Sequence, residues 1–342
     1  MSRSVASRSA HCLFLLAASC AAGPSPGEPV ADGRWAIAIH GGAGTIDRSS
    51  PKAELDGYRD ALGAALADAR LRLLRGEAAL DVCEAVVRTL EDDPHFNAGL
   101  GAAFDEQGHH TLDASIMDGT TLACGAVAGL RTVRHPITLA RRVMTDTPHV
   151  LLMGDGAEDF ATVAGVERVP NDWFDTEPRR RMLEEVLRER ARGGTAVAPR
   201  AMPGAAGYGT VGCVVRDARG RLAAATSTGG LTGKRFGRVG DAPIVGAGNY
   251  ADAFAAISGT GTGEEFIRHA VARTIAARMQ FGGESLQAAA AAVVLRTLHA
   301  GDGGVVAVDR DGHAVAVYNS DGMYRALADS AGRYEVAIFE DG

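Results

Sequence analysis

Thr210 is the residue around which the chemistry of this chain can be organised. It lies in the sequence GYGTVGCVV, between a glycine-loosened segment and an apolar run that is typical of a buried strand. A threonine hydroxyl alone is a weak nucleophile, but an N-terminal threonine carries an α-amino group with a reference pKa of roughly 7.7–8.0, which can accept a proton near neutral pH. Cleavage between Gly209 and Thr210 would therefore create a nucleophile and its base in one step.

Three segments downstream of Thr210 offer the groups that such a nucleophile needs. Residues 223–230 and 259–263 supply hydroxyls and exposed backbone N–H groups, and residues 237–241 contain Arg238 and Asp241. A threonine at a strand edge usually makes only local hydrogen bonds. An Arg–Asp pair is usually a surface ion pair that contributes little to the free energy of unfolding. Because Arg238 and Asp241 stand inside a glycine-rich segment, we expect them to bind a ligand.

Composition limits the classes of function. The chain has 342 residues, a formal net charge of −7, 46% hydrophobic residues and 44 glycines. No basic stripe is present, and an acidic chain is a poor partner for nucleic acid, so we expect no nucleic-acid binding. No stretch is long enough to span a bilayer, and we expect no membrane span. The length allows one large domain or two.

The N-terminal segment 1–26 reads as a secretory signal followed by a linker. Arg3 and Arg8 precede a short apolar core at residues 13–18, and a small-residue cleavage zone follows. We therefore expect an exported, periplasmic protein. Residues 17–20 also resemble a bacterial lipobox, which leaves a lipid anchor at Cys20 open. The other cysteines, Cys83, Cys124 and Cys213, have no metal-ligand spacing, and we expect them in the core.

Hydrophobic periodicity predicts an α+β fold. Helices are expected over residues 55–74, 81–90, 177–192, 264–279 and 284–299, and from residue 136 onward; strands are expected over 34–39, 114–117, 124–130, 150–153, 211–216, 222–226, 305–309, 314–318 and 334–339. Residues 193–207 show no periodicity and read as a connector that leads to Thr210. Strands grouped between helical pairs predict two central sheets with helices outside, an αββα sandwich of four layers.

These motifs resemble one family over nearly the whole chain after the signal. The chain resembles the plant-type L-asparaginases and isoaspartyl peptidases (β-aspartyl-peptidases), a threonine-peptidase branch of the N-terminal-nucleophile (Ntn) hydrolases. The matching segments are residues 40–44, 96–99, 112–114, 117–119, 209–212, 225–230, 237–241, 246–248 and 260–263. Their common order along the chain makes the match more specific than any single motif.

The resemblance implies a four-layer Ntn-hydrolase fold and a precursor that cleaves itself before Thr210. Residues 27–209 would become the α subunit and residues 210–342 the β subunit of one domain, with two such αβ units forming a dimer. Thr228 would hydrogen-bond Thr210, Thr260 and the Gly261 N–H would form the oxyanion hole, and Asn97 would brace the nucleophile region.

The resemblance also implies the substrates. Arg238 would hold a substrate α-carboxylate, while Asp241 and backbone at Gly261 and Gly263 would complete the binding of an aspartyl head group. L-Asparagine and β-aspartyl dipeptides would be hydrolysed through a β-aspartyl ester, with no cofactor. A structural sodium ion would be held by backbone carbonyls of Leu90, Glu91, Asp93, Phe96, Ala98 and Leu100. Two alternatives stay open: an aspartylglucosaminidase, and an uncleaved, inactive binder of acidic amino acids.

Overall fold

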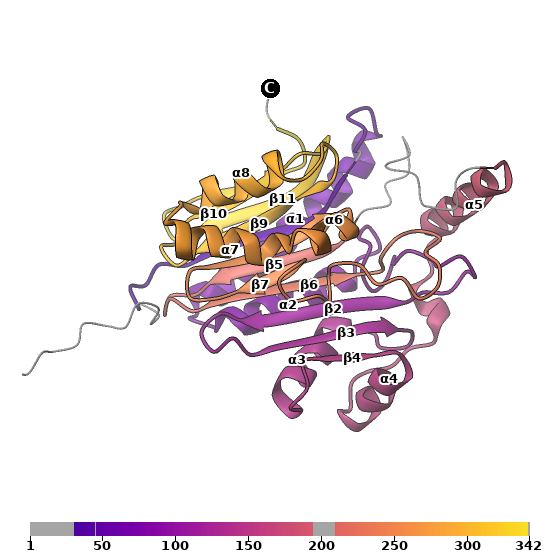
Figure 1. Cartoon of the computed structure of the whole chain (residues 1–342), viewed down its shortest axis with the longest axis horizontal. Helices are drawn as coiled ribbons and strands as arrows, with labels where there is room; N and C mark the ends of the chain where they lie inside the picture. The colour runs from indigo at the N-terminus through magenta and orange to yellow at the C-terminus, as the bar shows by residue number, and fades with distance from the viewer. Residues whose placement is uncertain (1–30, 45, 194–208, 341–342) are drawn as a thin grey trace, which may run out of the picture.

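The computed structural model describes residues 31–44, 46–193 and 209–340. The segment predicted to be a secretory signal, Cys20 and most of the connector over residues 193–207 lie outside the described residues. The remaining chain folds into two β-sheets with helices packed against them (Figure 1). The prediction of a fold with both helices and sheets is therefore confirmed.

The larger sheet contains eight strands. Its spatial order is β12 (Tyr334–Ala337), β11 (Gly322–Asp329), β1 (Ala36–Gly44), β5 (Val211–Arg216), β6 (Leu222–Thr228), β2 (Leu112–Asp118), β3 (Cys124–Leu130) and β4 (Leu151–Met153). All neighbours are antiparallel except β3 and β4, which are parallel. The strand that begins next to Thr210 is thus central and paired on both edges.

The smaller sheet contains four antiparallel strands. Its spatial order is β10 (Ala314–Tyr318), β9 (Gly303–Asp309), β8 (Ala255–Gly261) and β7 (Asn249–Ala251). The register places Thr260 of β8 opposite Gly304 of β9, and Gly261 opposite Gly303. Two glycines facing the end of β8 let its backbone approach β9 closely there.

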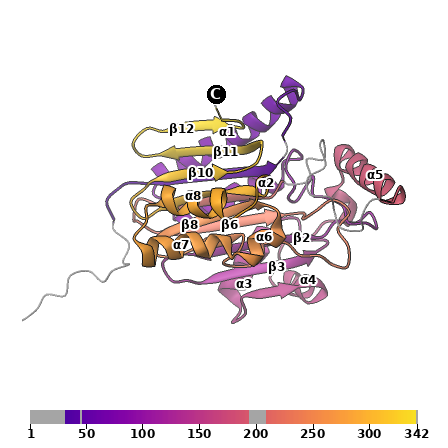
Figure 2. The ribbon, with the colours of Figure 1, turned by 45° about the horizontal axis from the view of Figure 1, so that its top comes forward.

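Helices flank the sheets. They are α1 (Lys52–Leu74), α2 (Ala79–Glu91), α3 (Pro136–Asp146), α4 (Gly154–Val163), α5 (Glu177–Ala191), α6 (Gly263–Arg268), α7 (Val271–Gly282) and α8 (Leu286–Arg296), with a 3-10 turn at Asn171–Phe174. None of these helices is both long and apolar enough to cross a membrane. In Figure 2, α7 and α8 lie on the side of the smaller sheet, while α1 and α2 lie behind the larger one.

The alternation of side chains along β1 explains how the layers pack. Ile37 and Ile39 point to one face, where they join a core formed with α1, α2 and α3. Ala36 and Ala38 point to the other face and pack with Val306 and other residues of the smaller sheet. Small side chains on this second face let the two sheets approach each other. A third core lies between β8, β9 and β10 and the helices α7 and α8.

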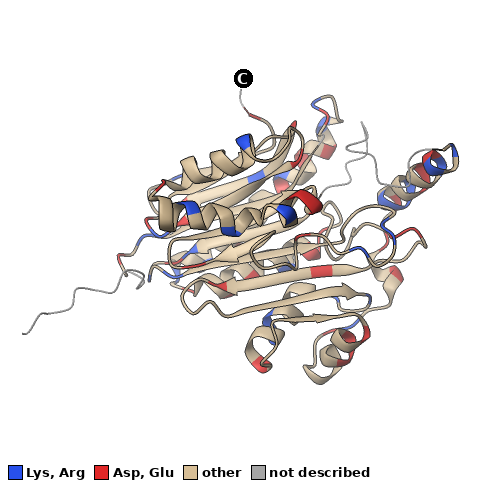
Figure 3. Ribbon diagram, in the orientation of Figure 1, with Lys and Arg blue, Asp and Glu red and all other residues tan. Residues whose placement is uncertain are grey.

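Charged residues are sparse on the strands and concentrated at loops and helices (Figure 3). Helix α5 carries both signs of charge and projects from the body of the molecule in Figure 1. A buried charged side chain is therefore unusual in this fold and needs an explanation. Lys234 and Asp241 are two such side chains, and both belong to the region around Thr210.

Several boundaries differ from the sequence prediction. The first strand extends beyond residue 39 through Gly44, because β11 supplies hydrogen-bonding partners for the glycine-rich stretch, with a bulge between His40 and Gly42. The helix expected over residues 264–279 is broken into α6 and α7 where Ala270 adopts φ +43°. Strands β7, β8 and β11 and helix α4 were not expected, since their glycine and alanine content hides any periodicity.

Candidate active site

Thr210 lies directly before β5, with 9% of its surface exposed. Pairing of Val211 with Ser227 brings it beside Thr228, the last residue of β6. The Thr210 hydroxyl donates a hydrogen bond of 3.1 Å to Thr228 Oγ1, which also accepts from the Gly230 N–H at 3.0 Å. The structure thus brings together the predicted nucleophile and the threonine predicted to hydrogen-bond it.

Asn97 lies on the other side of the Gly209–Thr210 peptide bond. Its main-chain N–H donates to the Gly209 carbonyl oxygen at 3.1 Å. Its side chain is fixed at both ends, because Nδ2 donates to the Gly230 carbonyl at 2.8 Å and Oδ1 accepts from the Ala103 N–H at 2.7 Å. A Cβ on Gly209 would lie only 2.8 Å from the Asn97 Cβ, so this close approach requires glycine before Thr210.

Thr260 and Gly261 end strand β8. The Thr260 side chain is fully buried, and its Oγ1 accepts a hydrogen bond of 3.3 Å from the Ala43 N–H, which leaves its own proton to be donated. Gly261 has φ +149°, and a Cβ there would lie 1.9 Å from the Asp302 carbonyl oxygen. Only glycine fits at position 261.

Arg238 and Asp241 are brought together with Gly263. A Cβ on Gly263 would lie 2.8 Å from Arg238 Nη2 and 2.8 Å from Asp241 Oδ1. Burial raises the pKa of Asp241 to about 7, although the positive charge of Arg238 opposes this. Within the described part of the chain, Asp241 Oδ2 is buried without a hydrogen-bond partner. A buried carboxylate oxygen in this condition is ready to accept a hydrogen bond from a ligand.

Glu264 was not predicted, yet it holds Arg238 in place. Its two carboxylate oxygens accept hydrogen bonds from Arg238 Nε and Nη2, both at 2.9 Å. Burial would lower the pKa of Arg238, but this bidentate pair outweighs burial and raises it. The sequence signal for Glu264 is its position directly after the glycine-rich run that ends at Gly263. The guanidinium therefore stays charged and oriented, with Nη1 outside this pair.

Lys234 is a second buried charge that was not predicted. Its Nζ donates to the carbonyls of Thr111 at 2.6 Å and Gly229 at 2.7 Å, and burial lowers its pKa to about 8. Burial also raises the pKa of the nearby Asp113. Lys234 thus lies behind the turn that follows Thr228 and fixes that turn through Gly229.

A small cavity joins these groups. It is lined by Gly209, Thr210, Thr228, Gly230, Leu231, Arg238, Gly240, Asp241 and Gly261, and its volume is about 10 Å³. This volume is too small for an amino acid, and Gly209 is one of its walls. The residue before the nucleophile therefore limits the space in the intact chain.

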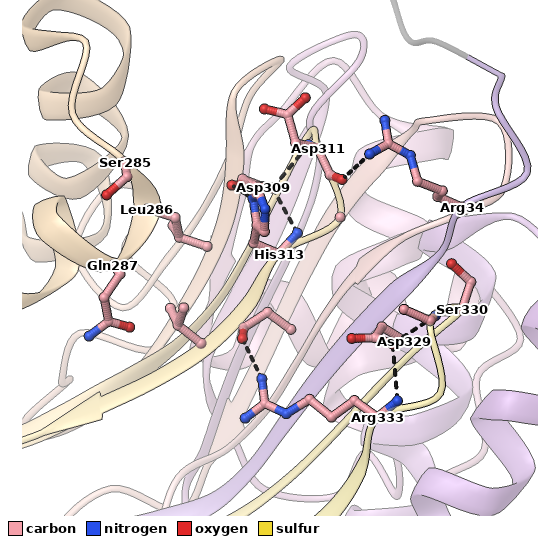
Figure 4. Close-up of a pocket in the computed structure, with 14 residues that line it drawn as sticks. Arg34, Ser285, Leu286, Gln287, Asp309, Asp311, His313, Asp329, Ser330 and Arg333 are labelled. Carbon is pink, nitrogen blue, oxygen red and sulfur yellow. Dashed lines mark hydrogen bonds and ion pairs between the residues drawn. The ribbon is translucent and has the colours of Figure 1, made fainter.

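A larger cavity of about 540 Å³ lies at the opposite end of β1 and is shown in Figure 4. Its ionic groups already have partners: His313 with Asp309 at 2.8 Å, and Arg34 with the Asp311 carbonyl at 2.8 Å. The hydroxyls of its two serines, Ser285 and Ser330, accept hydrogen bonds from the Ala288 and Trp35 N–H groups. The reactive groups of the described residues meet at the small cavity instead.

Comparison with known proteins identifies the family. A family model described as asparaginase matches residues 33–338. The chain belongs to the asparaginase family. It is 50% identical over 296 residues to the isoaspartyl peptidase of Salmonella typhimurium, covering 85% of this chain and 94% of that protein. It is 48% identical over 300 residues to the isoaspartyl peptidase of Escherichia coli, covering 86% and 92%.

A plant relative extends the match to the asparaginase family over a still longer segment. The probable isoaspartyl peptidase/L-asparaginase 2 of Arabidopsis thaliana is 43% identical over 327 residues, which cover 90% of this chain and 100% of that protein. The resemblance inferred from the motifs is thereby confirmed.

The loop over residues 90–100 of this asparaginase-family chain was predicted to hold sodium through its carbonyls. No group of three or more His, Cys, Asp or Glu side chains suited to a metal occurs in the described residues. The loop backbone is compact: the Glu91 carbonyl accepts from the Leu100 N–H at 2.7 Å. A Cβ on Gly101 would meet the carbonyl oxygens of Pro94 at 2.6 Å and Phe96 at 2.8 Å. Of these two carbonyls, that of Phe96 belongs to the predicted sodium ligands and that of Pro94 does not.

Proposed function

We propose that this protein is an autoproteolytically activated amidohydrolase that cleaves β-aspartyl dipeptides and L-asparagine through Thr210. The observation that carries the proposal is the placement of one hydroxyl: Thr210 Oγ1 lies 3.1 Å from Thr228 Oγ1, directly after a Gly209 carbonyl held by Asn97. The relatives named isoaspartyl peptidase support the substrate class.

Activation begins with attack of the Thr210 hydroxyl on the Gly209 carbonyl carbon. A C–O bond forms, the hydroxyl proton passes to the amide nitrogen, and the C–N bond breaks to leave an ester and a free α-amine on Thr210. The Asn97 N–H that already binds the Gly209 oxygen would stabilise the negative charge that develops on it. Water then hydrolyses the ester, releasing a Gly209 carboxylate and restoring the Thr210 hydroxyl.

Cleavage would divide the chain into an α subunit of residues 27–209 and a β subunit of residues 210–342. Withdrawal of Gly209 from the cavity wall would open the space that is about 10 Å³ in the intact chain. The one cleavage would thus both activate Thr210 and let substrate reach it, and the uncut precursor would be closed to substrate.

Substrate binding would use the charges at the cavity wall. Arg238, oriented by Glu264, would bind the α-carboxylate, and Asp241 with backbone at Gly261 and Gly263 would bind the α-ammonium. An aspartyl head group fixed at both charges would present its side-chain amide to Thr210. The requirement for both charges on one carbon restricts hydrolysis to β-linked aspartyl amides.

In the reaction, the α-amine of Thr210 would accept the hydroxyl proton as Oγ1 attacks the substrate amide carbon. The oxyanion would be bound by the Thr260 hydroxyl and the Gly261 N–H, donors that each contribute about 3 kcal/mol in comparable sites. The proton passes to the departing nitrogen, which leaves as an amine or ammonia. Water then hydrolyses the β-aspartyl ester.

Further parts of the proposal rest on the family. We assign the two facing sheets and their outer helices to the four-layer αββα sandwich of Ntn hydrolases. Carbonyl oxygens of Leu90, Glu91, Asp93, Phe96, Ala98 and Leu100 would hold a structural sodium ion. A dimer of αβ units is likewise what the family implies. Export to the periplasm is proposed from the signal-like residues 1–26 and not from the family, and lipidation of Cys20 stays an open alternative.

The test compares four compounds on one preparation. A β-aspartyl dipeptide and L-asparagine should be hydrolysed, whereas the α-linked isomer of the dipeptide should not. N-acetylglucosaminyl-asparagine tests the aspartylglucosaminidase alternative, and Thr210→Ala, isolated as an uncut chain, provides the inactive control. Binding of aspartate without turnover of any compound would instead indicate an inactive binding protein.

A further inference from the structure

A chain of buried hydrogen bonds ends on the main-chain carbonyl of Thr210. His40 Nδ1 lies 2.9 Å from that oxygen, and His40 Nε2 lies 2.8 Å from Ser258 Oγ. Ser258 Oγ in turn lies 2.7 Å from Thr226 Oγ1. The side chains of His40, Ser258 and Thr226 are all fully buried, and they come from β1, β8 and β6. The chain therefore connects both sheets to the nucleophile.

The direction of these hydrogen bonds is fixed. A carbonyl oxygen only accepts, so His40 Nδ1 carries a proton. Burial lowers the pKa of His40 to about 3, so the ring is neutral and its Nε2 is an acceptor. Ser258 must then donate to Nε2, so in the 2.7 Å contact with Ser258 the proton comes from Thr226. The Gly248 carbonyl, at 3.3 Å, is the weaker acceptor for the Thr226 hydroxyl. A Ser258 bond to the Ala225 carbonyl, at 3.4 Å, would leave Nε2 without a donor and is the weaker alternative.

The space for this chain exists only because position 212 is glycine. His40 lies opposite Gly212 in the pairing of β1 with β5. A Cβ on Gly212 would lie 2.0 Å from Ser258 Oγ and 2.3 Å from His40 Nε2. Any larger residue at position 212 would displace the imidazole and the serine together. The glycine that follows Thr210 by two residues thus admits the contact that holds its carbonyl.

Strand β1 also supports the oxyanion donors. The Ala43 N–H donates to Thr260 Oγ1 at 3.3 Å, three residues beyond His40. The segment over residues 40–44 therefore contacts the nucleophile through a side chain and the oxyanion hole through its backbone. A shift of β1 would therefore displace both the nucleophile, Thr210, and the oxyanion donor, Thr260.

We propose that His40 is a positioning residue that, kept in one tautomer by Ser258 and Thr226, fixes the backbone of Thr210 for cleavage and catalysis. This inference rests on the proposed role of Thr210 as an N-terminal nucleophile. After cleavage, Thr210 loses its covalent link to Gly209 and is held through the peptide that joins it to Val211. A donor on the Thr210 carbonyl oxygen fixes the plane of that peptide, and with it the position of the Cα that carries the hydroxyl and the amine. Misplacement by about 1 Å can cost about 100-fold in rate.

The experiment compares His40→Leu, which removes both ring nitrogens, with His40→Asn, whose Nδ2 can donate where Nδ1 does. Autocleavage is followed on denaturing gels, and kcat and KM are measured for a β-aspartyl dipeptide. We expect His40→Leu to lower both the cleavage rate and kcat by about 100-fold with KM nearly unchanged, and His40→Asn to recover about tenfold of that loss. The buried His110, which pairs with Asp175, provides the control His110→Leu, whose loss should be in thermal stability and not in kcat.

The ring itself gives a second readout. In ¹⁵N NMR spectra of the processed wild-type protein, His40 should show a protonated Nδ1 and an unprotonated Nε2, and Ser258→Ala should weaken this preference and lower kcat. A protonated Nε2 in the wild type, or unchanged kcat in His40→Leu, would overturn the proposal. If His40→Leu does not fold, Ser258→Ala and the wild-type spectrum still decide it. Failure of the wild type itself to cleave would instead count against the proposed function.

Discussion

The main-chain N–H of Asn97 donates a hydrogen bond of 3.1 Å to the carbonyl oxygen of Gly209, the residue directly before Thr210. This contact polarises the bond that activation must break and also fixes its distance from the nucleophile. On the other side, Thr228 accepts the hydrogen bond of the Thr210 hydroxyl. The scissile carbonyl and the attacking oxygen are therefore each held by a hydrogen bond before any cleavage occurs.

Replacing Gly209 by alanine should slow autocleavage. The new Cβ would lie 2.8 Å from the Asn97 Cβ, so the peptide must shift away from its N–H donor. We expect the cleavage rate to fall by about 100-fold, the loss that misplacement by about 1 Å brings. A time course on denaturing gels measures it. Gly156→Ala is the control, because a Cβ there meets no atom within 4 Å and cleavage should proceed normally. Equal rates for both variants would contradict the role given to Asn97.

Thr228→Val should lower turnover with little effect on substrate affinity. Valine has nearly the shape of threonine but cannot accept the hydrogen bonds from Thr210 and Gly230. We expect kcat of the processed enzyme to fall by about 100-fold, within the range for a group that assists proton transfer. Thr228→Ser retains the hydroxyl and should stay within about tenfold of the wild type. Equal kcat for Thr228→Val and Thr228→Ser would show that the hydroxyl is dispensable.

Glu264→Gln should weaken binding of substrate while leaving the chemical step intact. The neutral amide can accept only one of the two Arg238 hydrogen bonds, so the guanidinium loses its fixed orientation. We expect KM to rise by about tenfold at similar kcat, corresponding to about 1.4 kcal/mol. Glu265→Gln is the neighbouring control, since Glu265 pairs with Arg268 and not with Arg238. A fall in kcat alone would place Glu264 in the chemistry and not in substrate orientation.

The affinity for substrate should depend on the ionisation of Asp241. Burial raises its pKa to about 7, so lowering the pH through that value removes the charge that would bind the α-ammonium. We expect kcat/KM to fall by up to about 100-fold per pH unit below both transitions, because protonation of the Thr210 α-amine, with a reference pKa of roughly 7.7–8.0, also removes the base. A limiting slope of only about tenfold per pH unit, as for one ionisation, would contradict the assignment of Asp241.

The same carboxyl should affect stability with the opposite trend. A pKa raised above the unfolded-state value of 3.8 means that the folded chain binds the proton more tightly. This stabilising contribution is fully present below pH 3.8 and is lost as the pH rises through about 7. Asp241→Asn should therefore raise the melting temperature relative to the wild type at about pH 8, where the buried carboxyl is ionised, and leave it unchanged at about pH 4. Differential scanning calorimetry at the two pH values measures this.

Sequence patterns predicted those parts of the molecule in which the signal is local. Amphipathic helices such as α2 and apolar strands such as β5 could be predicted from periodicity. Strand β8, with the sequence AAISGTG, could not, because small residues pack on both of its faces and leave no alternation. The threonine at the end of the connector and the hydroxyls downstream could be found because the motifs that contain them, taken together and in order, resemble one family.

The missing parts of the site depend on contacts across sheets. His40 and Ser258 are 218 positions apart in the sequence, and they meet because the sheet that contains β1 packs against the sheet that contains β8. Lys234 could not be assigned because its partners are carbonyls, which have no residue-type signature. The pairing of Arg238 with Glu264 likewise follows from the turn into α6 and not from spacing.

Catalysis depends on the cutting of one peptide bond, which makes Thr210 an N-terminal nucleophile. N-terminal sequencing combined with intact mass measurement of the purified wild-type protein tests this. We expect two polypeptides, one of which begins Thr-Val-Gly-Cys-Val-Val and accounts for residues 210–342. A single uncut chain that nevertheless hydrolyses β-aspartyl dipeptides would contradict it.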